Sequence, residues 1–441
     1  MTSVVSNSSV LAKTMDLNEV ELFRKRSDTW ISSSETEPDD LEILDASVDM
    51  LVIAYNFAPF SDASAVTVAK RIRDFGVPVH VVSQDLSTIR KLDLQLTRLV
   101  RPYVTKHYQV TSAPTFAAWK GIAMFVAEAM TLLDENLKKG KYRRMYSRSM
   151  FPASHFLAAH IKRLYPNTHW IAEFSDPIRH TVEGLKRPGG DFELDSWAMS
   201  LIDGLADEVR TELLHDTDVF RWCETIAFEN ADKIWFTNEF QKEVMLSSVK
   251  DALRLGGVRK KSEVFSHPTL PGALYSLGKS SVRRRDHGFY IGYFGEFYAN
   301  RGLDDLFKSL SMMHADDLRR IEVHVYTSSV DVCQRAVDQA NLSRVVHVHG
   351  SLDFLDFCAT AKNMDLLVVC DVVPGNIYEK NPYLPSKVSD YLGAMTNIMA
   401  FVWPGSVLST SSKVDRFLIG DAVGGAQYIT QRLKTRNPHD K

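Results

Sequence analysis

The sequence predicts an α/β fold with two doubly wound Rossmann-like domains that face one another across a cleft. Continuous apolar runs alternate with helical patterns, as in parallel sheets that helices cover on both faces. The alternation starts again after a polar, basic segment, and 441 residues are enough for two domains. Ligands bind such sheets at the carboxyl ends of the strands, so we expect the site in the cleft.

Composition and charge shifts divide the chain into four segments. Residues 1–45 are rich in Ser, Thr, Asp and Glu, which predicts a disordered tail. An N-terminal domain is expected at 46–277 and a C-terminal domain at 288–441. The polar, basic segment 278–287 between them is interpreted as a linker.

The N-terminal domain opens as strand, helix and strand. Val48–Tyr55 is a continuous apolar run, a helical pattern follows as far as Gly76, and Val77–Ser83 is the next apolar run. This order predicts a parallel βαβ unit. Further strands are expected at Tyr142–Ser147, His169–Phe174, Lys233–Thr237 and Glu263–Ser266, and further helices at 116–133, 155–161, 197–230 (one or two) and 239–246.

The C-terminal domain opens with the apolar run Phe289–Ile291, a turn containing Gly292 and Gly295, and a helical pattern that ends near Leu310. Later strands are expected at Ile321–Tyr326, Val345–His349, Asp365–Cys370 and Asn397–Val402, with helices at 330–340, 353–361 and 386–394.

Composition excludes several classes of protein. A net charge of −3 argues against a dedicated nucleic-acid binder. The four cysteines are far apart in sequence, so we expect reduced thiols rather than a zinc site. No uninterrupted apolar run has the length of a membrane span, and the N-terminus lacks the pattern of a signal peptide, so export is not expected.

The turn after Phe289–Ile291 is the first candidate site. Backbone N–H groups of a glycine turn and a helix N-terminus together favour a bound anion, often a phosphate. Arg301 stands at the expected helix start, where a guanidinium can hold a diphosphate bidentately. The alternative is an ordinary βα turn with a surface arginine.

The stretch Asn381–Tyr391 is the second candidate site. Ser386 is a typical helix-start residue, and Lys387 and Asp390 lie three apart on one helix face. A lysine and a carboxylate there suit a phosphate and a pair of ribose hydroxyls. The alternative is a surface salt bridge.

These stretches together carry a resemblance. GYFGEFYANRGLDDL, HVHGSL, DLLVVCDV and PYLPSKVSDYLGA resemble, in this order, the nucleotide-sugar domain of GT-B glycosyltransferases, most of all the retaining family 4 type. Four segments of the N-terminal domain are similar to acceptor-domain segments of the same family: VIAYNFAPFSDASAVTVAKRI, MYSRSMFPASHFLAAHIK, WIAEFSDP and ADKIWFTNEFQ. The resemblance implies a cytoplasmic enzyme that uses a nucleotide-diphosphate sugar, with no metal and no further cofactor. Its acceptor would be a saccharide or a lipid-linked molecule, in the synthesis of cell-surface polysaccharide or glycoconjugate.

The resemblance also implies roles for particular residues. Arg301 takes the place of the phosphate-binding lysine, Asp390 that of the second acid, which grips the ribose, and Lys387 that of an extra phosphate contact. The segment Pro382–Pro385 should lie along the diphosphate and sugar, and the backbone near Gly350 should meet the base. The donor-binding residues expected in all are Gly295, Glu296, Arg301, Gly350, Leu384, Ser386, Lys387 and Asp390.

The sequence departs from the family's pattern in three places. Glu296 stands where an arginine is common, and Pro382 stands where the first acid should be. The loop after Val48–Tyr55 lacks the usual paired glycines. An outward-pointing Glu296 and an ion pair with Arg301 are both open, and Glu379 and Asn376 are candidates for the missing acid's sugar contact.

Two residues of the N-terminal domain are the candidate catalytic groups. Asp176 follows a strand and precedes Pro177, so it should face the cleft and orient the acceptor or steady positive charge in the transition state. The alternative is a turn or cap aspartate. His155 lies at an expected helix start, with a packed core histidine as the alternative.

Three further hypotheses remain open. The basic run from Lys138 to Arg144 suits either an anionic membrane surface, at the inner face of the membrane, or a solvated helix end. A sugar-nucleotide epimerase has the same architecture. A non-catalytic homologue that binds a nucleotide or a partner would explain Glu296 and Pro382.

Overall fold

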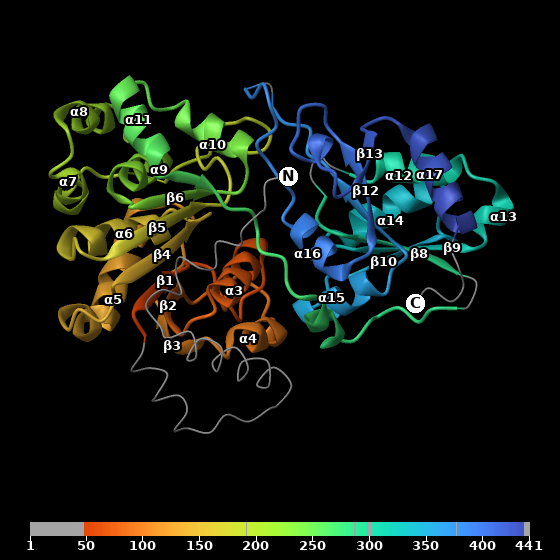
Figure 1. The fold of residues 1–441 in the computed structure, drawn as a ribbon, viewed down its shortest axis with the longest axis horizontal. Coiled ribbons are helices and arrows are strands. Elements are labelled where there is room, and N and C mark those ends of the chain that lie inside the picture. Colours follow the sequence, from red (N-terminus) through yellow and green to blue (C-terminus); the bar gives the residue numbers. More distant parts are fainter. Residues whose placement is uncertain (1–47, 191, 286–287, 298–301, 376, 436–441) are drawn as a thin grey trace, which may run out of the picture. The chain divides into compact units, whose positions relative to one another are not determined.

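The computed structural model describes residues 48–190, 192–285, 288–297, 302–375 and 377–435 (Figure 1). The predicted tail 1–45 and Arg301 lie outside the described residues. The chain divides into two compact units. Unit 1 runs up to Thr181 and continues over Lys186–Pro268, and unit 2 comprises Val182–Leu185 and the chain from Thr269 onward.

Unit 1 is built on a seven-stranded sheet with the order β3-β2-β1-β4-β5-β6-β7, and its neighbouring strands are parallel. Figure 1 shows helices on both sides of its strands, the doubly wound arrangement that the sequence predicts. The strands are β1 Met50–Ile53, β2 Val79–Gln84, β3 Val104–Val110, β4 Arg144–Ser149, β5 His169–Phe174, β6 Lys233–Phe236 and β7 Ser262–Val264.

Several helices of unit 1 begin at a capping side chain. Asp62 caps α3 by accepting hydrogen bonds from the N–H groups of Ser64 and Ala65, and Gly76 ends the helix at a φ of 64°, where a glycine is favoured. The helices are α3 Ala63–Phe75, α4 Leu94–Val100, α5 Trp119–Lys138, α6 Ala153–Leu164, α7 Ser196–Ile202, α8 Asp207–His215, α9 Val219–Asn230, α10 Glu239–Leu246 and α11 Ala252–Lys260.

Unit 2 is built on a six-stranded parallel sheet with the order β10-β9-β8-β11-β12-β13. The strands are β8 Phe289–Phe294, β9 Ile321–Tyr326, β10 Val346–His349, β11 Leu366–Cys370, β12 Asn397–Val402 and β13 Asp415–Leu418. The helices are α12 Asp304–Ser311, α13 Ala315–Leu318, α14 Val330–Gln339, α15 Phe354–Lys362, α16 Lys387–Ala394 and α17 Ala422–Thr435, with short 3-10 helices η3 Gly272–Ser276 and η4 Leu408–Thr410.

Each sheet has its own hydrophobic core. In unit 1 the core contains aromatic side chains of three helices and one strand: Phe125 on α5, Phe156 on α6, Trp222 on α9 and Trp170 on β5. In unit 2 the core joins β8, β9 and β11 to α12 and α17. All four cysteines are buried free thiols, as expected from their spacing.

The structure confirms every strand expected from the sequence and corrects three predictions. The stretch 197–230 forms three helices, α7, α8 and α9, because Asp207 and Asp218 begin new helical turns inside it. The strands β3 and β13 were not expected. Both lie at a sheet edge, where exposed polar residues interrupt the apolar pattern.

The expected linker 278–287 is the third correction, because its described part packs on unit 2. Lys279 N–H donates to Asp356 Oδ1 at 2.7 Å, and Arg284 Nη2 donates to Asp365 Oδ1 at 2.6 Å. A Cβ on Gly278 would lie 2.0 Å from the Leu355 carbonyl oxygen, so this contact requires glycine. The division between the units falls at Pro268 and Thr269 instead.

Candidate functional site

The end of β8 and helix α16 meet through one buried tyrosine. The backbone N–H of Phe294, the last residue of β8, donates to Tyr391 Oη at 3.0 Å. Tyr391 is 1% exposed, and its ring lies 6.2 Å from that of Phe294. The two stretches that the sequence analysis singled out therefore lie together, at the carboxyl edge of the unit 2 sheet.

The turn after β8 begins with Gly295 and Glu296. Gly295 N–H donates to the Tyr326 carbonyl at 3.0 Å, which ties the turn to the end of β9. The Glu296 carboxylate accepts from Ser328 N–H at 3.1 and 3.2 Å, from Ser328 Oγ at 2.5 Å and from Thr327 Oγ1 at 3.2 Å. Glu296 thus binds the turn that leads into α14, which gives the acid a structural role there.

The start of α16 holds the predicted Ser386 and Lys387. Ser386 is the N-cap residue but makes no side-chain capping bond. The Lys387 ammonium lies 4.2 Å from the centre of the Phe357 ring on α15, a cation–π contact. Because the side chain is only half-buried, its charge remains close to solvent beside the helix N-terminus.

The segment Pro382–Pro385 leads into this helix start. Asn381, which is 0% exposed, fixes it: Nδ2 donates to the Val372 carbonyl at 2.8 Å, and Oδ1 accepts from Tyr383 N–H at 2.9 Å. Leu384 is half-buried. This anchoring holds Leu384 and the following helix start in one conformation.

Asp390 and Gly350 differ in accessibility. Asp390 is 2% exposed, and its backbone carbonyl accepts a hydrogen bond from Tyr275 Oη at 2.6 Å. Gly350, directly after β10, is exposed, with open space where a Cβ would be. The backbone at Gly350 is therefore accessible to a ligand, whereas a ribose contact by Asp390 needs a local opening and stays a prediction.

Asp176 lies in unit 1, two residues after β5 ends at Phe174. Burial raises the pKa of its carboxyl above the usual range, against the opposing effects of Arg187 and Arg148. The carboxylate accepts no hydrogen bond within the described part of the chain, so it does not act there as a cap. A carboxyl group perturbed in this way at the end of a strand has the features of a functional acid.

His155 lies on α6 and is 1% exposed. Its Nδ1 shares a hydrogen bond of 2.8 Å with Ser147 Oγ, which also accepts from Trp170 Nε1 at 2.8 Å. Burial, with a smaller contribution from the charge of Arg148, lowers the pKa of His155 to about 3. This neutral, packed geometry favours the core alternative, and a catalytic role stays a prediction.

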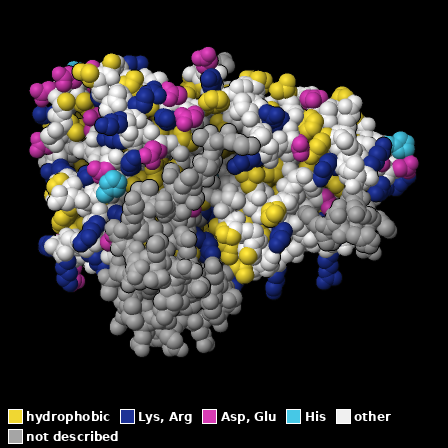
Figure 2. All heavy atoms as spheres, in the orientation of Figure 1, with side chains coloured by type: hydrophobic (Ala, Val, Ile, Leu, Met, Phe, Trp, Pro, Cys, Tyr) yellow, Lys and Arg dark blue, Asp and Glu magenta, His cyan; other side chains and the backbone are white. Residues whose placement is uncertain are grey.

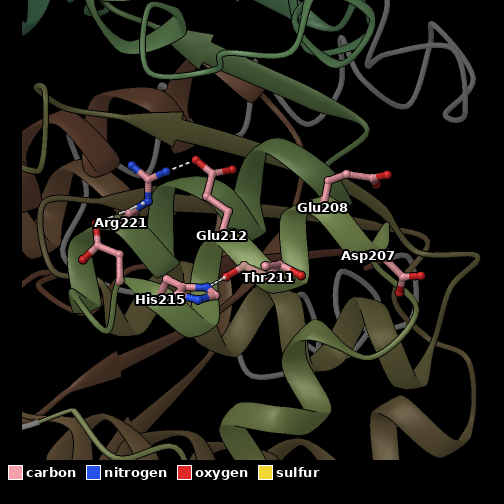
Figure 3. Close-up of a pocket in the computed structure, with 7 residues that line it drawn as sticks. Asp207, Glu208, Thr211, Glu212, His215 and Arg221 are labelled. Atoms are coloured by element: carbon pink, nitrogen blue, oxygen red, sulfur yellow. Dashed lines mark hydrogen bonds and ion pairs between the residues drawn. The ribbon is translucent and has the colours of Figure 1, made fainter.

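An open hollow of about 760 Å³ lies elsewhere in unit 1, on α8 and the start of α9 (Figure 3). Several of its polar groups pair with one another. Arg221 forms ion pairs with Glu212 and Asp216, and His215 Nδ1 lies 2.7 Å from the Thr211 carbonyl (Figure 3). The hollow contains none of the residues predicted to bind a donor or to act in catalysis.

The surface charge is mixed in sign. Figure 2 shows Lys and Arg interspersed with Asp and Glu on the visible face. In the basic run, Lys138 pairs with Asp134 at 2.8 Å and Lys139 with Glu135 at 2.5 Å, which is typical of a solvated helix end. No helix within the described ranges is long and apolar enough to cross a membrane, and no group of three or more His, Cys, Asp or Glu there could hold a metal ion.

Two doubly wound parallel sheets, with the candidate residues at their carboxyl edges, define the GT-B class of glycosyltransferase folds. Solved structures agree. A sucrose-phosphate synthase from Thermosynechococcus elongatus is similar at 12% sequence identity and a TM-score of 0.53, covering 88% of this chain and 90% of that one. A structure described as trehalose-6-phosphate from E. coli, bound with UDP-2-fluoro glucose, is similar at 10% identity and a TM-score of 0.50, covering 89% and 92%.

These likenesses establish the fold of this chain. No protein-family model matches the sequence, and no curated protein is similar enough to count as a match. The resemblance to the family 4 type therefore stays a prediction.

Sequence reasoning missed the residues that hold the site together. Tyr391, Asn381, Phe357 and Ser328 were not singled out, although each contacts a predicted site residue or its neighbour. The contacts of Tyr391, Phe357 and Ser328 join segments far apart in the sequence, so no local pattern marks these residues.

Proposed function

We propose that this chain is a glycosyltransferase that moves a sugar from a nucleotide-diphosphate sugar to a saccharide or lipid-linked acceptor, with retention and without a metal ion. The hydrogen bond from Phe294 to Tyr391 carries the proposal, because it brings the turn after β8 beside the start of α16. Turn N–H groups, a helix N-terminus and the Lys387 ammonium together favour a diphosphate.

The acceptor side of the reaction is assigned to unit 1. In a retaining transfer by front-face attack, the leaving phosphate takes the proton of the acceptor hydroxyl, while positive charge develops on the donor sugar. We assign to Asp176 the role of orienting that hydroxyl or stabilising this charge, and the absence of a capping hydrogen bond to its carboxylate within the described residues supports the assignment. The proposed setting is cytoplasmic, at the inner face of the membrane, in polysaccharide or glycoconjugate synthesis.

A donor screen tests the proposal. Thermal unfolding is measured with UDP-, GDP-, ADP- and TDP-sugars, beginning with UDP-sugars because one structural neighbour is bound with UDP-2-fluoro glucose. A nucleotide-sugar that binds the native state raises the midpoint of unfolding. The matched nucleoside without phosphates is the control and is expected to give no shift. If no nucleotide-sugar stabilises the protein at millimolar concentration, the donor site is refuted.

A non-catalytic nucleotide-binding homologue is the second candidate. Two observations favour it: Glu296 is bound to Ser328 and Thr327, and Pro382 stands where the first acid of the resembled family lies. Release of free nucleotide from a bound nucleotide-sugar separates the candidates. Binding without transfer or slow hydrolysis supports the non-catalytic protein.

A further inference from the structure

The carboxyl edge of the unit 1 sheet holds a buried group of charged side chains. Arg71 on α3, Arg148 on β4 and Glu173 on β5 are 1%, 4% and 0% exposed. Arg148 and Glu173 lie opposite one another in the strand register, one residue before their strands end. This is the edge at which doubly wound sheets bind ligands.

Glu173 is fully occupied by its neighbours. Its Oε2 accepts from Arg71 Nε and from Tyr146 Oη, both at 3.0 Å, and its Oε1 accepts from Arg148 Nη1. One buried carboxylate therefore serves two guanidinium groups. The other acid near Arg71, Asp74, is 46% exposed, so solvent weakens its effect.

The two arginines differ in how many of their guanidinium N–H groups have hydrogen-bond partners. Arg71 is satisfied, because its Nη2 also donates to the carbonyls of Phe265 at 3.3 Å and Ser266 at 3.1 Å. Arg148 uses only Nη1 within the described part of the chain, and its buried Nε has no partner there. Nε and Nη2 form the side of a guanidinium that donates two parallel hydrogen bonds to the oxygens of a carboxylate or phosphate.

His267 has a second unpaired polar atom in the same place. Its buried Nδ1 has no partner among the residues that the structure describes. Burial lowers the pKa of His267 well below its usual value, and the charges of Arg148, Lys70 and Arg71 lower it further. His267 is therefore a neutral imidazole close to these cations, able to donate a hydrogen bond to an anion.

We propose that the free side of Arg148, together with His267, binds an oxyanion carried by the acceptor, a phosphate or a carboxylate. The assignment to the acceptor rests on the proposed function, in which the donor diphosphate is held in unit 2. Asp176 supports it, because the charge of Arg148 also acts on that carboxyl group. An anionic acceptor bound there lies beside the group proposed to orient its hydroxyl.

Two charged sugars and one neutral sugar test whether this site binds an oxyanion. Binding of glucose 6-phosphate, glucuronate and glucose is measured by calorimetry and thermal unfolding. We expect glucose 6-phosphate or glucuronate to bind and glucose not to bind, and the stronger of the two charged sugars identifies the anion. Arg148→Gln and His267→Ala should each weaken that binding by about tenfold or more, since each removes a hydrogen bond to a charged group.

The matched control is Arg144→Gln, on the same strand but at its other end, where the guanidinium pairs with Asp49. Its binding of charged sugars should equal that of the wild type. His267→Ala removes no ion pair, so it remains informative if Arg148→Gln fails to fold. Wild-type protein that does not distinguish charged sugars from glucose, or variants that bind like the wild type, overturn the proposal.

Nucleotide-sugar binding, measured in the same samples, separates this proposal from the proposed function. Charged-sugar binding without nucleotide-sugar binding refutes the donor site and leaves the oxyanion site standing. Nucleotide-sugar binding without charged-sugar binding refutes the oxyanion site alone.

Discussion

Tyr391 supplies the hydrogen-bond acceptor for the backbone N–H of Phe294. At the end of β8 the Phe294 N–H is buried, and the Tyr391 hydroxyl accepts its hydrogen bond at 3.0 Å. Burial raises the pKa of Tyr391 well above its usual value, so the hydroxyl remains protonated. One side chain of α16 therefore fixes the position of the turn that is proposed to bind phosphate.

Tyr391→Phe should destabilise unit 2 and weaken donor binding together. The change leaves the buried Phe294 N–H without its acceptor, which costs about 1–3 kcal/mol. The turn after β8 then loses its tie to α16, so nucleotide-sugar affinity should fall as well. Denaturant unfolding and calorimetry measure the two effects.

Tyr428→Phe is the control, because the Tyr428 hydroxyl pairs with Asp415 at an exposed position of the same unit. It should change stability little and nucleotide-sugar affinity not at all. Equal effects of the two variants on affinity would show that the tie to Phe294 does not shape the donor site.

Lys387→Ala should weaken nucleotide-sugar binding by about tenfold or more, the scale of a lost hydrogen bond to a charged group. Stability should fall by only about 0.5–1 kcal/mol, from the lost contact with the Phe357 ring. The control is Lys362→Ala on α15, whose ammonium bonds to Ser276 Oγ. Unchanged affinity of the Lys387 variant in calorimetry refutes its phosphate role.

The sequence predicts the central strands because a buried strand has a continuous run of apolar residues. β8, Phe289–Phe294, is buried at all six positions and reads as an apolar run. β3, Val104–Val110, is an edge strand that exposes Lys106 and His107, so its pattern is polar and it was missed. Edge strands keep one side free of partners, and their sequence is correspondingly less constrained.

The candidate site divides in the same way. Lys387 was found because a helix start and its spacing are local features. The binding of Glu296 to Ser328, 32 residues further along the chain, could not be found, because it depends on how β8 and β9 pair. The burial of Asp390 against Tyr275 likewise follows from packing between distant segments.

Gly278→Ala should destabilise the packing of segment 278–285 on unit 2. The new Cβ would lie 2.0 Å from the Leu355 carbonyl oxygen, and relieving such a clash costs roughly 1–3 kcal/mol. Gly256→Ala is the matched control: it lies inside α11 with open space around the Cβ, and alanine should stabilise that helix by up to about 1 kcal/mol. Chemical unfolding measures the stability of both variants. Equal stabilities would contradict the close contact between Gly278 and the Leu355 carbonyl oxygen.

Glu224→Gln should make the protein more stable at alkaline pH. Glu224 is 4% exposed, and burial raises the pKa of its carboxyl to about 7, against the effects of Arg179 and the Ser248 hydroxyl. The folded state therefore holds a proton that the unfolded state releases near pH 4.5. The stability that this bound proton contributes is fully present below about pH 4.5 and is lost as the pH rises through about 7, by roughly 3 kcal/mol.

Unfolding free energies at pH 5 and pH 8 check this, because glutamine cannot lose the proton and should flatten the decline. Glu243→Gln is the control. Its carboxylate pairs with Arg259, whose hydrogen bond lowers the pKa, so the variant should not gain stability at high pH. An unchanged pH dependence in the Glu224 variant would mean that this carboxyl is ionised in the folded protein.

Asp176→Asn separates an enzyme from a non-catalytic homologue. Asp176 lies in unit 1, whereas the proposed donor contacts lie in unit 2. The variant should therefore keep its affinity for the nucleotide-sugar. If the carboxylate orients the acceptor or steadies charge in the transition state, the transfer rate should fall by roughly a hundredfold or more, the scale of losing one preorganised electrostatic group.

The comparison variant is Asp195→Asn, because Asp195 is a true helix cap. Its carboxylate accepts from Ala198 N–H at 2.7 Å and from Trp119 Nε1 at 2.9 Å. That change should lower stability by about 1 kcal/mol and leave the rate of the folded protein unchanged. Asp176→Asn should lower the rate and leave stability nearly unchanged, because the half-buried carboxyl has a raised pKa and the substitution removes no capping bond. Melting temperature, nucleotide affinity and turnover, measured on both variants, show whether Asp176 has a catalytic or a structural role. If Asp176→Asn loses stability but keeps full turnover, Asp176 is a structural residue.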